Sequence, residues 1–289
     1  MTKVDHVILS RFNLPSTGNE SAVRARDGWL ENRVVLFERY CLPSVMRQTS
    51  NNFHWIIYFD PQSPDWLLQR ITAWRADGNP FEPIFRASVS NDQRLSDMSD
   101  LFPIKGKTLI TTNLDNDDGL ACDFIERLQG ANCASERTAL YLANGLIMQG
   151  GRTFLTSDKS NAFCSVREPW DGAVTCWAAY HNQLGAIMPT KAIDGDPAWL
   201  QVVHGANVSN RVHGKLISPD KYRRLFPATL DEAIEPDSTE KMADNLLGRP
   251  KRWLREAARL TVKKSVYALF GFEGLDKVKH AWTRLKGRS

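Results

Sequence analysis

Three carboxylates stand close together in the run Leu114-Asp115-Asn116-Asp117-Asp118. Like charges at this spacing repel one another unless a cation neutralises them. Mg²⁺ is typically held by one or two carboxylates together with substrate phosphates, and Mn²⁺ prefers the same oxygen ligands. The run therefore predicts a metal–diphosphate clamp, with Asp115 and Asp117 as metal ligands and Asp118 beside them. In such a clamp the metal is a Lewis acid that offsets the charge on a departing diphosphate.

Part of this run is also compatible with three different roles. Asp117 or Asp118 could cap the helix predicted to follow. Asp115, Asp117 and Glu126 stand at positions one, three and twelve of an EF-hand calcium loop. Leu120, however, occupies the position where that loop requires glycine. A phosphatase of the haloacid dehalogenase type uses the first Asp of such a pair as its nucleophile, usually after the first strand of the sheet rather than the fourth.

The elements that position the run follow from the hydrophobic pattern of the chain. Buried strands are predicted at residues 6–12, 53–60, 83–86 and 107–114. Helices are predicted at residues 29–46, 66–74 and 120–128. Strands alternating with helices predict a parallel α/β sheet. Ligands bind such sheets beyond the carboxyl ends of the strands, so the run after the fourth strand lies where a site would form.

Shorter apolar runs follow residue 139. They predict additional strands of the same domain, some antiparallel, at residues 141–148, 153–156, 162–166, 174–179 and 184–188. The stretch around 227–238 is acidic and contains proline. The sequence therefore predicts an α/β domain over residues 1–227 and a basic helical tail over residues 228–289.

The charge of the chain is concentrated in that tail. The net charge of the 289 residues is +4, but residues 247–289 contain twelve Lys or Arg and three Asp or Glu, so they carry +9 and the remainder −5. Leu254, Ala258 and Leu269 fall on one helical face. A basic amphipathic helix of this kind is typical of anionic membrane surfaces. A helical hairpin packed on the domain is the alternative, and no motif for nucleic-acid binding accompanies the charge.

Cysteine usage and hydropathy indicate a compartment. The five cysteines are far apart, without metal-ligand or disulfide spacing, which is typical of a reducing cytoplasm. No signal peptide or membrane-spanning run is evident. We therefore expect a cytoplasmic protein that is peripheral at the inner membrane through its tail.

Several motifs resemble known glycosyltransferases. Residues 42–49 followed by the strand that closes on Asp60 are similar to the helix-then-strand opening of GT-A enzymes. Arg11-Phe12-Asn13, Leu36-Phe37-Glu38, the acidic run and Val203-His204-Gly205-Ala206-Asn207 resemble the rhamnosyltransferase family of bacterial polysaccharide gene clusters. The resemblance covers roughly residues 6 to 215. Family members often carry an Arg directly before the acidic run, where this chain has Asn113.

The resemblance implies a GT-A-like (Rossmann-like) fold, with a mixed, mainly parallel sheet flanked by helices and a C-terminal helical extension. It implies a nucleotide-sugar donor, with Asp115 and Asp117 as the metal-binding pair, Asp60 near the nucleoside and Arg11 at the mouth of the first strand. His204 is expected to be a third metal ligand, since imidazole can bind Mn²⁺, and Asn207 to lie near substrate. Asp60 could instead be a turn residue before Pro61. His204 could be a hydrogen-bonded structural residue.

An inverting transfer also needs a base that deprotonates the acceptor hydroxyl. Glu168 and Asp171 are candidates, and Trp170 between them could stack on a sugar face. A surface turn would explain the same residues. His181 is a candidate for the acceptor cleft.

The resulting hypothesis is a glycosyltransferase that uses Mn²⁺ or Mg²⁺ and moves a sugar, with rhamnose as the candidate, from a nucleotide-sugar donor. The acceptor is expected to be a bacterial surface glycan or a lipid-linked glycan. The alternatives are a catalytically inactive, membrane-peripheral binding or assembly protein and a metal-dependent phosphohydrolase.

Overall fold

Four parallel strands form the part of the sheet that the first half of the sequence predicted. In the computed structural model, which describes residues 4–15, 27–134, 136–204, 211–255 and 257–258, these strands lie in the order β4-β1-β2-β3. Their bounds are Val4–Arg11 for β1, His54–Phe59 for β2, Glu82–Phe85 for β3 and Thr108–Asn113 for β4. The central residues of β1, β2 and β4 are buried on both faces, which explains why these strands appear in the sequence as continuous apolar runs.

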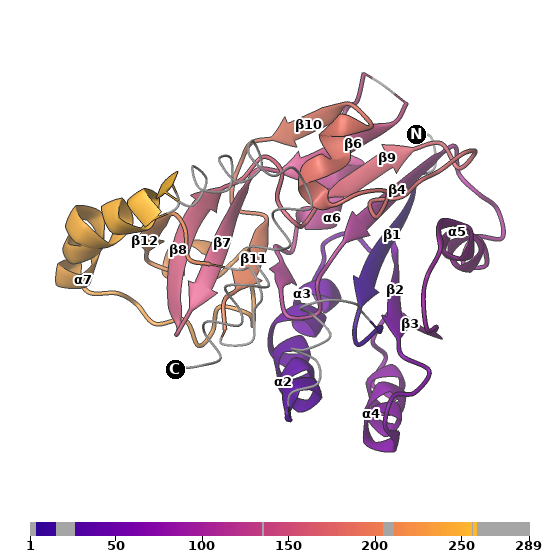
Figure 1. Ribbon diagram of the computed structural model, residues 1–289, viewed down its shortest axis with the longest axis horizontal. Helices are drawn as coiled ribbons and strands as arrows, with labels where there is room; N and C mark the ends of the chain where they lie inside the picture. The colour runs from indigo at the N-terminus through magenta and orange to yellow at the C-terminus, as the bar shows by residue number, and fades with distance from the viewer. Residues whose placement is uncertain (1–3, 16–26, 135, 205–210, 256, 259–289) are drawn as a thin grey trace. The chain divides into compact units, whose positions relative to one another are not determined.

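Three further strands extend this sheet past β4 and make it mixed (Figure 1). They are β6 (Thr138–Leu142), β9 (Ser165–Glu168) and β10 (Thr190–Ile193). β9 runs antiparallel to β4, with Thr112 opposite Ser165 and Leu109 opposite Glu168. The carboxyl end of β9 therefore lies at the amino end of β4.

Helices cover both faces of this sheet. On the face that carries Ile8 lie α2 (Trp29–Leu36), the π-helical turn η1 (Phe37–Cys41), α3 (Leu42–Met46), α4 (Asp65–Ala76) and α6 (Phe124–Gln129). On the face that carries Val7 and Leu9 lie α5 (Asn91–Ser99) and the 3₁₀ helix η2 (His181–Ala186). The arrangement is a three-layered α/β/α unit.

A second sheet of five short strands joins the first beside the acidic run. Its order is β12-β8-β7-β11-β5. The bounds are Gly119–Leu120 for β5, Asn144–Gln149 for β7, Arg152–Ser157 for β8, Trp199–Val202 for β11 and Lys215–Ile217 for β12. A Cβ at Gly145 would come within 2.0 Å of the Trp199 ring, so glycine is required where this indole lies on β7. Trp199 also stacks on Phe163 with ring centroids 5.0 Å apart.

The structure differs from the predicted elements in several places. Residues 141–148 are not one strand, because β6 ends before β7 begins and Ala143 lies between them. The predicted strand at 174–179 is wrong, since these residues form an irregular segment, and the one at 184–188 is wrong because η2 occupies most of it. Helix α5 was not predicted, since Arg94 and Asp97 are two of its three buried side chains and leave little apolar periodicity.

The chain falls into two compact units, residues 1–236 and 237–289. Residues 228–236, which the sequence analysis placed with the tail, belong to the first unit and bury Leu230 and Ala233 beside the 3₁₀ helix η3 (Asp220–Tyr222). In the second unit, a capping box between Asp237 and Glu240 begins α7 (Ser238–Ala243), and a π-helical turn, η4 (Asp244–Gly248), follows. Within the described ranges, no helix is both long and apolar enough to cross a membrane.

Candidate active site

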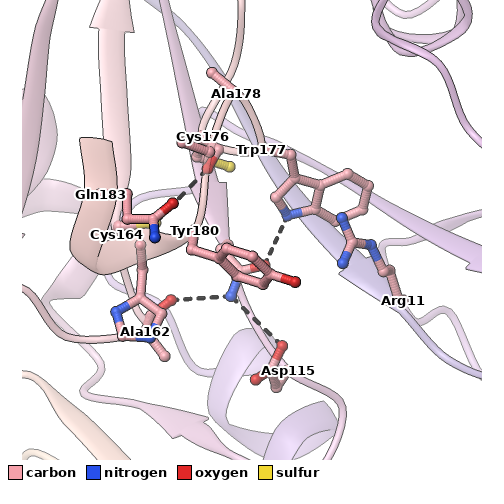
Figure 2. A pocket seen from close by; sticks show the side chains of 12 residues that line it. Arg11, Asp115, Ala162, Cys164, Cys176, Trp177, Ala178, Tyr180 and Gln183 are labelled. Carbon is pink, nitrogen blue, oxygen red and sulfur yellow. Dashed lines mark hydrogen bonds between the residues drawn. The ribbon is translucent and has the colours of Figure 1, made fainter. Parts of the chain in front are cut away.

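The carboxyl ends of β1 and β4 form one edge of a pocket of about 650 Å³ (Figure 2). Arg11 is the last residue of β1 and Asn113 the last residue of β4. The amide of Leu114 donates to the carbonyl of Leu9 at 3.1 Å, so strand pairing continues to the first residue of the acidic run. The remaining wall includes Asp115 and a group of residues between positions 162 and 183, namely Ala162, Cys164, Cys176, Trp177, Ala178, Ala179, Tyr180, His181 and Gln183.

The three carboxylates of the run have different surroundings. Asp115 is exposed and lines the pocket. Asp117 is buried, and its Oδ2 lies 2.5 Å from Nη1 of Arg33 and 2.9 Å from Nε2 of His204. Asp118 is buried and accepts a hydrogen bond from the Val202 amide of β11 at 2.8 Å. In the part of the chain that the structure describes, Asp115 is thus the carboxylate of the run that faces the pocket.

Proximity of the carboxylates affects how readily they ionise. Burial, the negative charge of Asp117 and that of Asp115 raise the pKa of Asp118 well above its usual value. Desolvation by the surrounding protein and the negative charge of Asp117 raise the pKa of Asp115, although the positive charge of Arg11 opposes this shift. Burial also disfavours ionised Asp117, but the hydrogen bond to His204 and the charge of Arg33 prevail, so the pKa of Asp117 is lowered. The cluster thus favours additional positive charge beside Asp115.

Trp177 forms another part of the pocket wall. The Arg11 guanidinium lies 4.1 Å from the centroid of the Trp177 ring, a cation–π contact. Indole Nε1 donates to Oδ1 of Asn113 at 2.7 Å, while Nδ2 of Asn113 donates to the Ala162 carbonyl at 2.9 Å. Asn113 therefore links the end of β4 to both sides of the pocket. Tyr180, at 78% exposed, projects its ring into the same opening.

The two pocket thiols are unsuited to nucleophilic catalysis. Burial raises the pKa of Cys176 to about 12. Burial also raises the pKa of Cys164 well above its usual value. Since the thiolate is the reactive form, both side chains form an uncharged wall at neutral pH.

Two further predicted site residues lie at this edge of the sheet. Asp60 follows β2, and its Oδ1 accepts from the Gln62 amide at 2.8 Å in the turn that the sequence offered as an alternative. Its own amide donates to Oδ1 of Asn13, so this turn is tied to the segment after β1. His181 lines the pocket, with Nδ1 hydrogen-bonded to the Ser160 carbonyl. Asn207 lies outside the described residues.

Glu168, Trp170 and Asp171 lie toward the opposite end of the sheet. Nε1 of Trp170 donates to Oδ2 of Asp5, near the start of β1. Arg11 follows Asp5 by six positions, which is roughly 20 Å along a strand. Glu168 is fully buried opposite Leu109, whereas Asp171 is exposed. This geometry does not support Glu168 or Asp171 as a catalytic base or Trp170 as a residue that stacks on a sugar, and these roles stay predictions.

A comparison of the sequence with known families identifies the class to which this site belongs. Residues 5–216 match the family described as "Putative rhamnosyl transferase". The chain belongs to this family. Membership confirms the predicted resemblance and, at the level of the family, the prediction of a glycosyltransferase. The mixed, mainly parallel sheet flanked by helices confirms the predicted α/β class.

Solved structures show distant likenesses. S. aureus TarS is 10% identical with a TM-score of 0.42, over 70% of this chain and 37% of TarS. TarS 1-349 with UDP-GlcNAc is 10% identical with a TM-score of 0.44, over 76% of this chain and 64% of the other. The mannosyltransferase PcManGT from Pyrobaculum calidifontis, with GDP-Man and Mn²⁺, is 10% identical with a TM-score of 0.41, over 100% and 88%.

These likenesses have clear limits. The chain spans little more than a third of the length of TarS. All three TM-scores are below 0.5, so the likenesses do not identify a donor, an acceptor or a metal for this chain. No significant match was found among curated proteins.

The sequence did not point to Arg33 or Trp177. Arg33 lies on α2 and contacts both Asp117 and, at 3.1 Å, Oδ1 of Asn116. Three neighbouring carboxylates need a positive charge nearby, which was a signal for a basic side chain. The signal did not identify Arg33 as that side chain. Trp177 was not identified as a site residue because its segment was predicted to be a strand.

Proposed function

We propose that this family member transfers a sugar, with rhamnose as the candidate, from a nucleotide-sugar donor to a surface-glycan or lipid-linked acceptor. The observation that carries the proposal is the pocket at the carboxyl ends of β1 and β4, where Arg11 and Asp115 line the same space. A guanidinium forms strong charge-assisted hydrogen bonds with phosphate. Membership of a rhamnosyl transferase family supports glycosyl transfer as the reaction.

The residues of the run partly fit a divalent cation. Asp115, Asp117 and His204 would hold Mn²⁺ or Mg²⁺, which supplies Lewis-acid stabilisation of the departing diphosphate. In favour, Asp115 opens on the pocket, and His204 is 2.9 Å from Asp117. Against a complete protein cage, no group of three or more His, Cys, Asp or Glu side chains forms a ligand set in the described residues. A cation bound here therefore depends on oxygen atoms of the donor as well.

Further side chains contribute to substrate binding. Arg11 binds the diphosphate, and Asp60, at the neighbouring strand end, lies toward the nucleoside. The exposed ring of Tyr180 and the imidazole of His181 form the side of the pocket available to the acceptor. Aromatic rings offer an apolar face to sugars, which suits this position.

Ligand-induced stabilisation tests the proposal. Thermal unfolding is measured with UDP, GDP and dTDP, each with and without Mn²⁺, because a ligand that binds only the folded state raises Tm. We expect at least one diphosphate to raise Tm in wild type and in Asp77→Ala, an exposed aspartate on a surface turn, but not in Asp115→Ala. No stabilisation of the wild type by any diphosphate would reject donor binding.

A panel of nucleotide sugars then identifies the reaction. Metal-dependent release of nucleoside diphosphate, faster with a rhamnosyl donor than with glucosyl or mannosyl donors, is the expected result. Release of inorganic phosphate from simple phosphomonoesters would support the phosphohydrolase alternative. Diphosphate binding without turnover of any donor would support an inactive binding protein.

We also propose that the second unit contacts an anionic membrane surface. Among its described residues, five large apolar side chains are at least 60% exposed: Met242, Leu246, Leu247, Trp253 and Leu254. Lys241, Arg249, Lys251 and Arg255 lie among them in the sequence. Apolar groups that enter the headgroup region and basic groups that pair with lipid phosphates bind such surfaces together.

Sedimentation with phosphatidylglycerol vesicles tests this contact, with phosphatidylcholine vesicles as the control for charge. Leu246→Ser with Leu247→Ser should reduce binding, whereas the exposed Val35→Ser of the first unit should not. Wild-type protein that stays in the supernatant with both lipids would reject the membrane contact. A concentration-dependent dimer in light scattering would favour helix packing between copies instead.

A further inference from the structure

Thr175 adopts a backbone conformation that β-branched residues rarely tolerate. Its φ is 69°, in the left-handed region, and its side chain is fully buried. A β-branched residue at positive φ is strained, and such strain persists only where the surroundings determine the conformation. Thr175 also lies directly before Cys176 and Trp177, which line the pocket.

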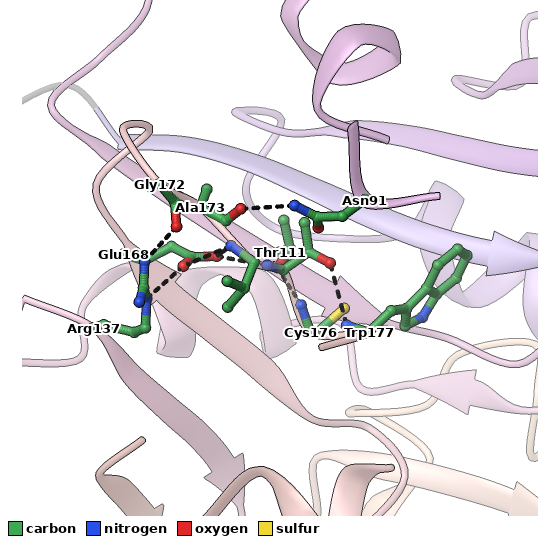
Figure 3. Close-up of polar contacts among 10 residues, drawn as sticks. Asn91, Thr111, Arg137, Glu168, Gly172, Ala173, Cys176 and Trp177 are labelled. Atoms are coloured by element: carbon green, nitrogen blue, oxygen red, sulfur yellow. Dashed lines mark hydrogen bonds and ion pairs between the residues drawn. The ribbon is translucent and has the colours of Figure 1, made fainter. Parts of the chain in front are cut away.

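Glu168 binds two consecutive backbone amides of this turn. Its carboxylate accepts hydrogen bonds from the amide of Thr175 at 2.8 Å and from the amide of Val174 at 3.1 and 3.2 Å. Nε of Arg137 donates to Oε2 of Glu168 at 2.9 Å. Figure 3 shows these contacts meeting on one buried carboxylate.

The neighbouring strand holds the next residue of the segment. Oγ1 of Thr111, in β4, accepts from the Cys176 amide at 2.8 Å. Nδ2 of Asn91 donates to the Ala173 carbonyl at 3.1 Å. Three consecutive amides, at residues 174–176, are therefore bound by side chains rather than by a neighbouring strand.

The turn connects Glu168 to residues that line the pocket. Glu168 pairs with Leu109, Cys176 is bound by Thr111, and the Trp177 indole is bound by Asn113. The segment thus follows β4 over four residues, roughly 13 Å, from its amino half to its carboxyl end. There the Trp177 ring lies against the Arg11 guanidinium.

We propose that Glu168 is a positioning residue. Through the strained turn at Thr175 it fixes the Trp177 indole, and the indole holds the Arg11 guanidinium at the pocket. The assignment of Arg11 to the donor diphosphate rests on the proposed function, whereas the link from Glu168 to Trp177 does not. The role differs from that of a base, because Glu168 contacts backbone amides and Arg137 instead of the pocket.

The test separates these roles with Glu168→Gln. Both carboxylate oxygens of Glu168 accept hydrogen bonds, but a glutamine side chain has one acceptor oxygen, so it cannot keep the whole set. The protein is labelled with 5-fluorotryptophan, and the ¹⁹F resonance of Trp177 is assigned as the one missing in Trp177→Phe. Glu136→Gln, an exposed neighbour of Arg137 in the sequence, is the matched control.

We expect Glu168→Gln to shift or broaden the Trp177 resonance and to weaken nucleoside diphosphate binding several-fold, as Trp177→Phe should. Its turnover at saturating donor should fall by less than the affinity does. Glu136→Gln should change none of these. An unchanged Trp177 resonance and diphosphate affinity, with turnover lost, would identify Glu168 as a base and overturn the proposal. The resonance is read without any ligand, so it decides the link from Glu168 to Trp177 even if no nucleotide binds.

A rescue variant makes the test independent of general destabilisation. Glycine adopts positive φ without strain, so Thr175→Gly should lessen the dependence of the turn on Glu168. In Glu168→Ala with Thr175→Gly, the Trp177 resonance should lie closer to wild type than in Glu168→Ala alone. If neither Glu168 variant folds, Arg137→Met removes one partner of Oε2 and must shift the same resonance. An unshifted resonance in folded Arg137→Met would overturn the proposal.

Discussion

The two ends of the seven-stranded sheet contain similar residues in different states. At the carboxyl end of β1 and β4, Asp115, Arg11 and Trp177 line a pocket. Toward the amino end, Glu168 and Trp170 are fully engaged with protein partners: Glu168 with amides and an arginine, Trp170 with Asp5. Residue type alone therefore does not distinguish a residue that can act on a substrate from one that stabilises the fold.

The difference lies in which partners the fold supplies. A carboxylate whose hydrogen-bonding capacity is filled by the protein stabilises structure, whereas one that opens on a pocket can bind a cation or substrate. Desolvation and the charge of Asp117 raise the pKa of Asp115. A raised pKa is typical of carboxylates that open on a pocket. The carboxyl end is thus the candidate site, and the amino end supports it.

Removing one carboxylate at each end tests this comparison most strongly. Asp115→Asn should lower the rate of sugar transfer roughly 100-fold or more, because it removes the carboxylate proposed to hold the cation that offsets the charge of the departing diphosphate. Asp171→Asn, exposed near the opposite end, should retain nearly the wild-type rate. Steady-state release of nucleoside diphosphate measures both. An equal loss of rate in Asp171→Asn would support Asp171 as the catalytic base predicted from the sequence and would contradict the difference between the two ends of the sheet.

The two arginines should affect different quantities. Arg137→Met leaves the buried Glu168 without its cationic partner and should lower the free energy of unfolding by about 2–3 kcal/mol. Arg11→Met should leave unfolding within about 0.5 kcal/mol of wild type, as for most surface changes, and weaken diphosphate binding instead. Urea unfolding and calorimetric titration measure the two effects. Loss of stability in Arg11→Met with unchanged binding would contradict the assignment.

Acid should destabilise the protein through His6, a buried residue of β1. Burial lowers the pKa of His6 from 6.5 to about 3. Below pH 6.5 the unfolded chain therefore takes up a proton at His6 that the folded protein does not. The free energy of unfolding is thus unaffected by His6 above pH 6.5 and decreases as the pH falls toward 3. By pH 5 the loss is about 2 kcal/mol. His6→Gln should reduce the change in unfolding free energy between about pH 7 and pH 5, and an unchanged pH dependence would exclude His6 as its source.

The smallest expected difference concerns the two tryptophans. Trp170→Phe removes the hydrogen bond to Asp5 and should cost about 1–2 kcal/mol of stability without changing donor affinity. Trp177→Phe removes the hydrogen bond to Asn113 and weakens the cation–π contact with Arg11. We expect it to weaken diphosphate binding several-fold, by about 0.5–1 kcal/mol. Equal effects of both variants on binding would show that the amino end also contacts the donor.

Local patterns were sufficient for the elements nearest the site. The apolar runs that became β1, β2 and β4, and the helical spacing over residues 29–46, depend on short-range properties, and the structure contains them. The prediction failed where the structure depends on polar contacts. Helix α5 buries Arg94 and Asp97, and the segment around Trp177 is held by Glu168 and Thr111 in place of a strand partner.

The sequence by itself determined the α/β class, the acidic run after the fourth strand and the family of the chain. Only the tertiary structure decided which polar residues meet. Glu168 ends β9, and β9 runs antiparallel to β4, so Glu168 lies away from Asp115 even though each stands at the end of a strand. The direction of a strand depends on pairing between residues far apart in the chain, and no local pattern contains it. For the same reason Arg33, 84 positions before Asp117, could be recognised as the partner of that carboxylate only in the folded chain.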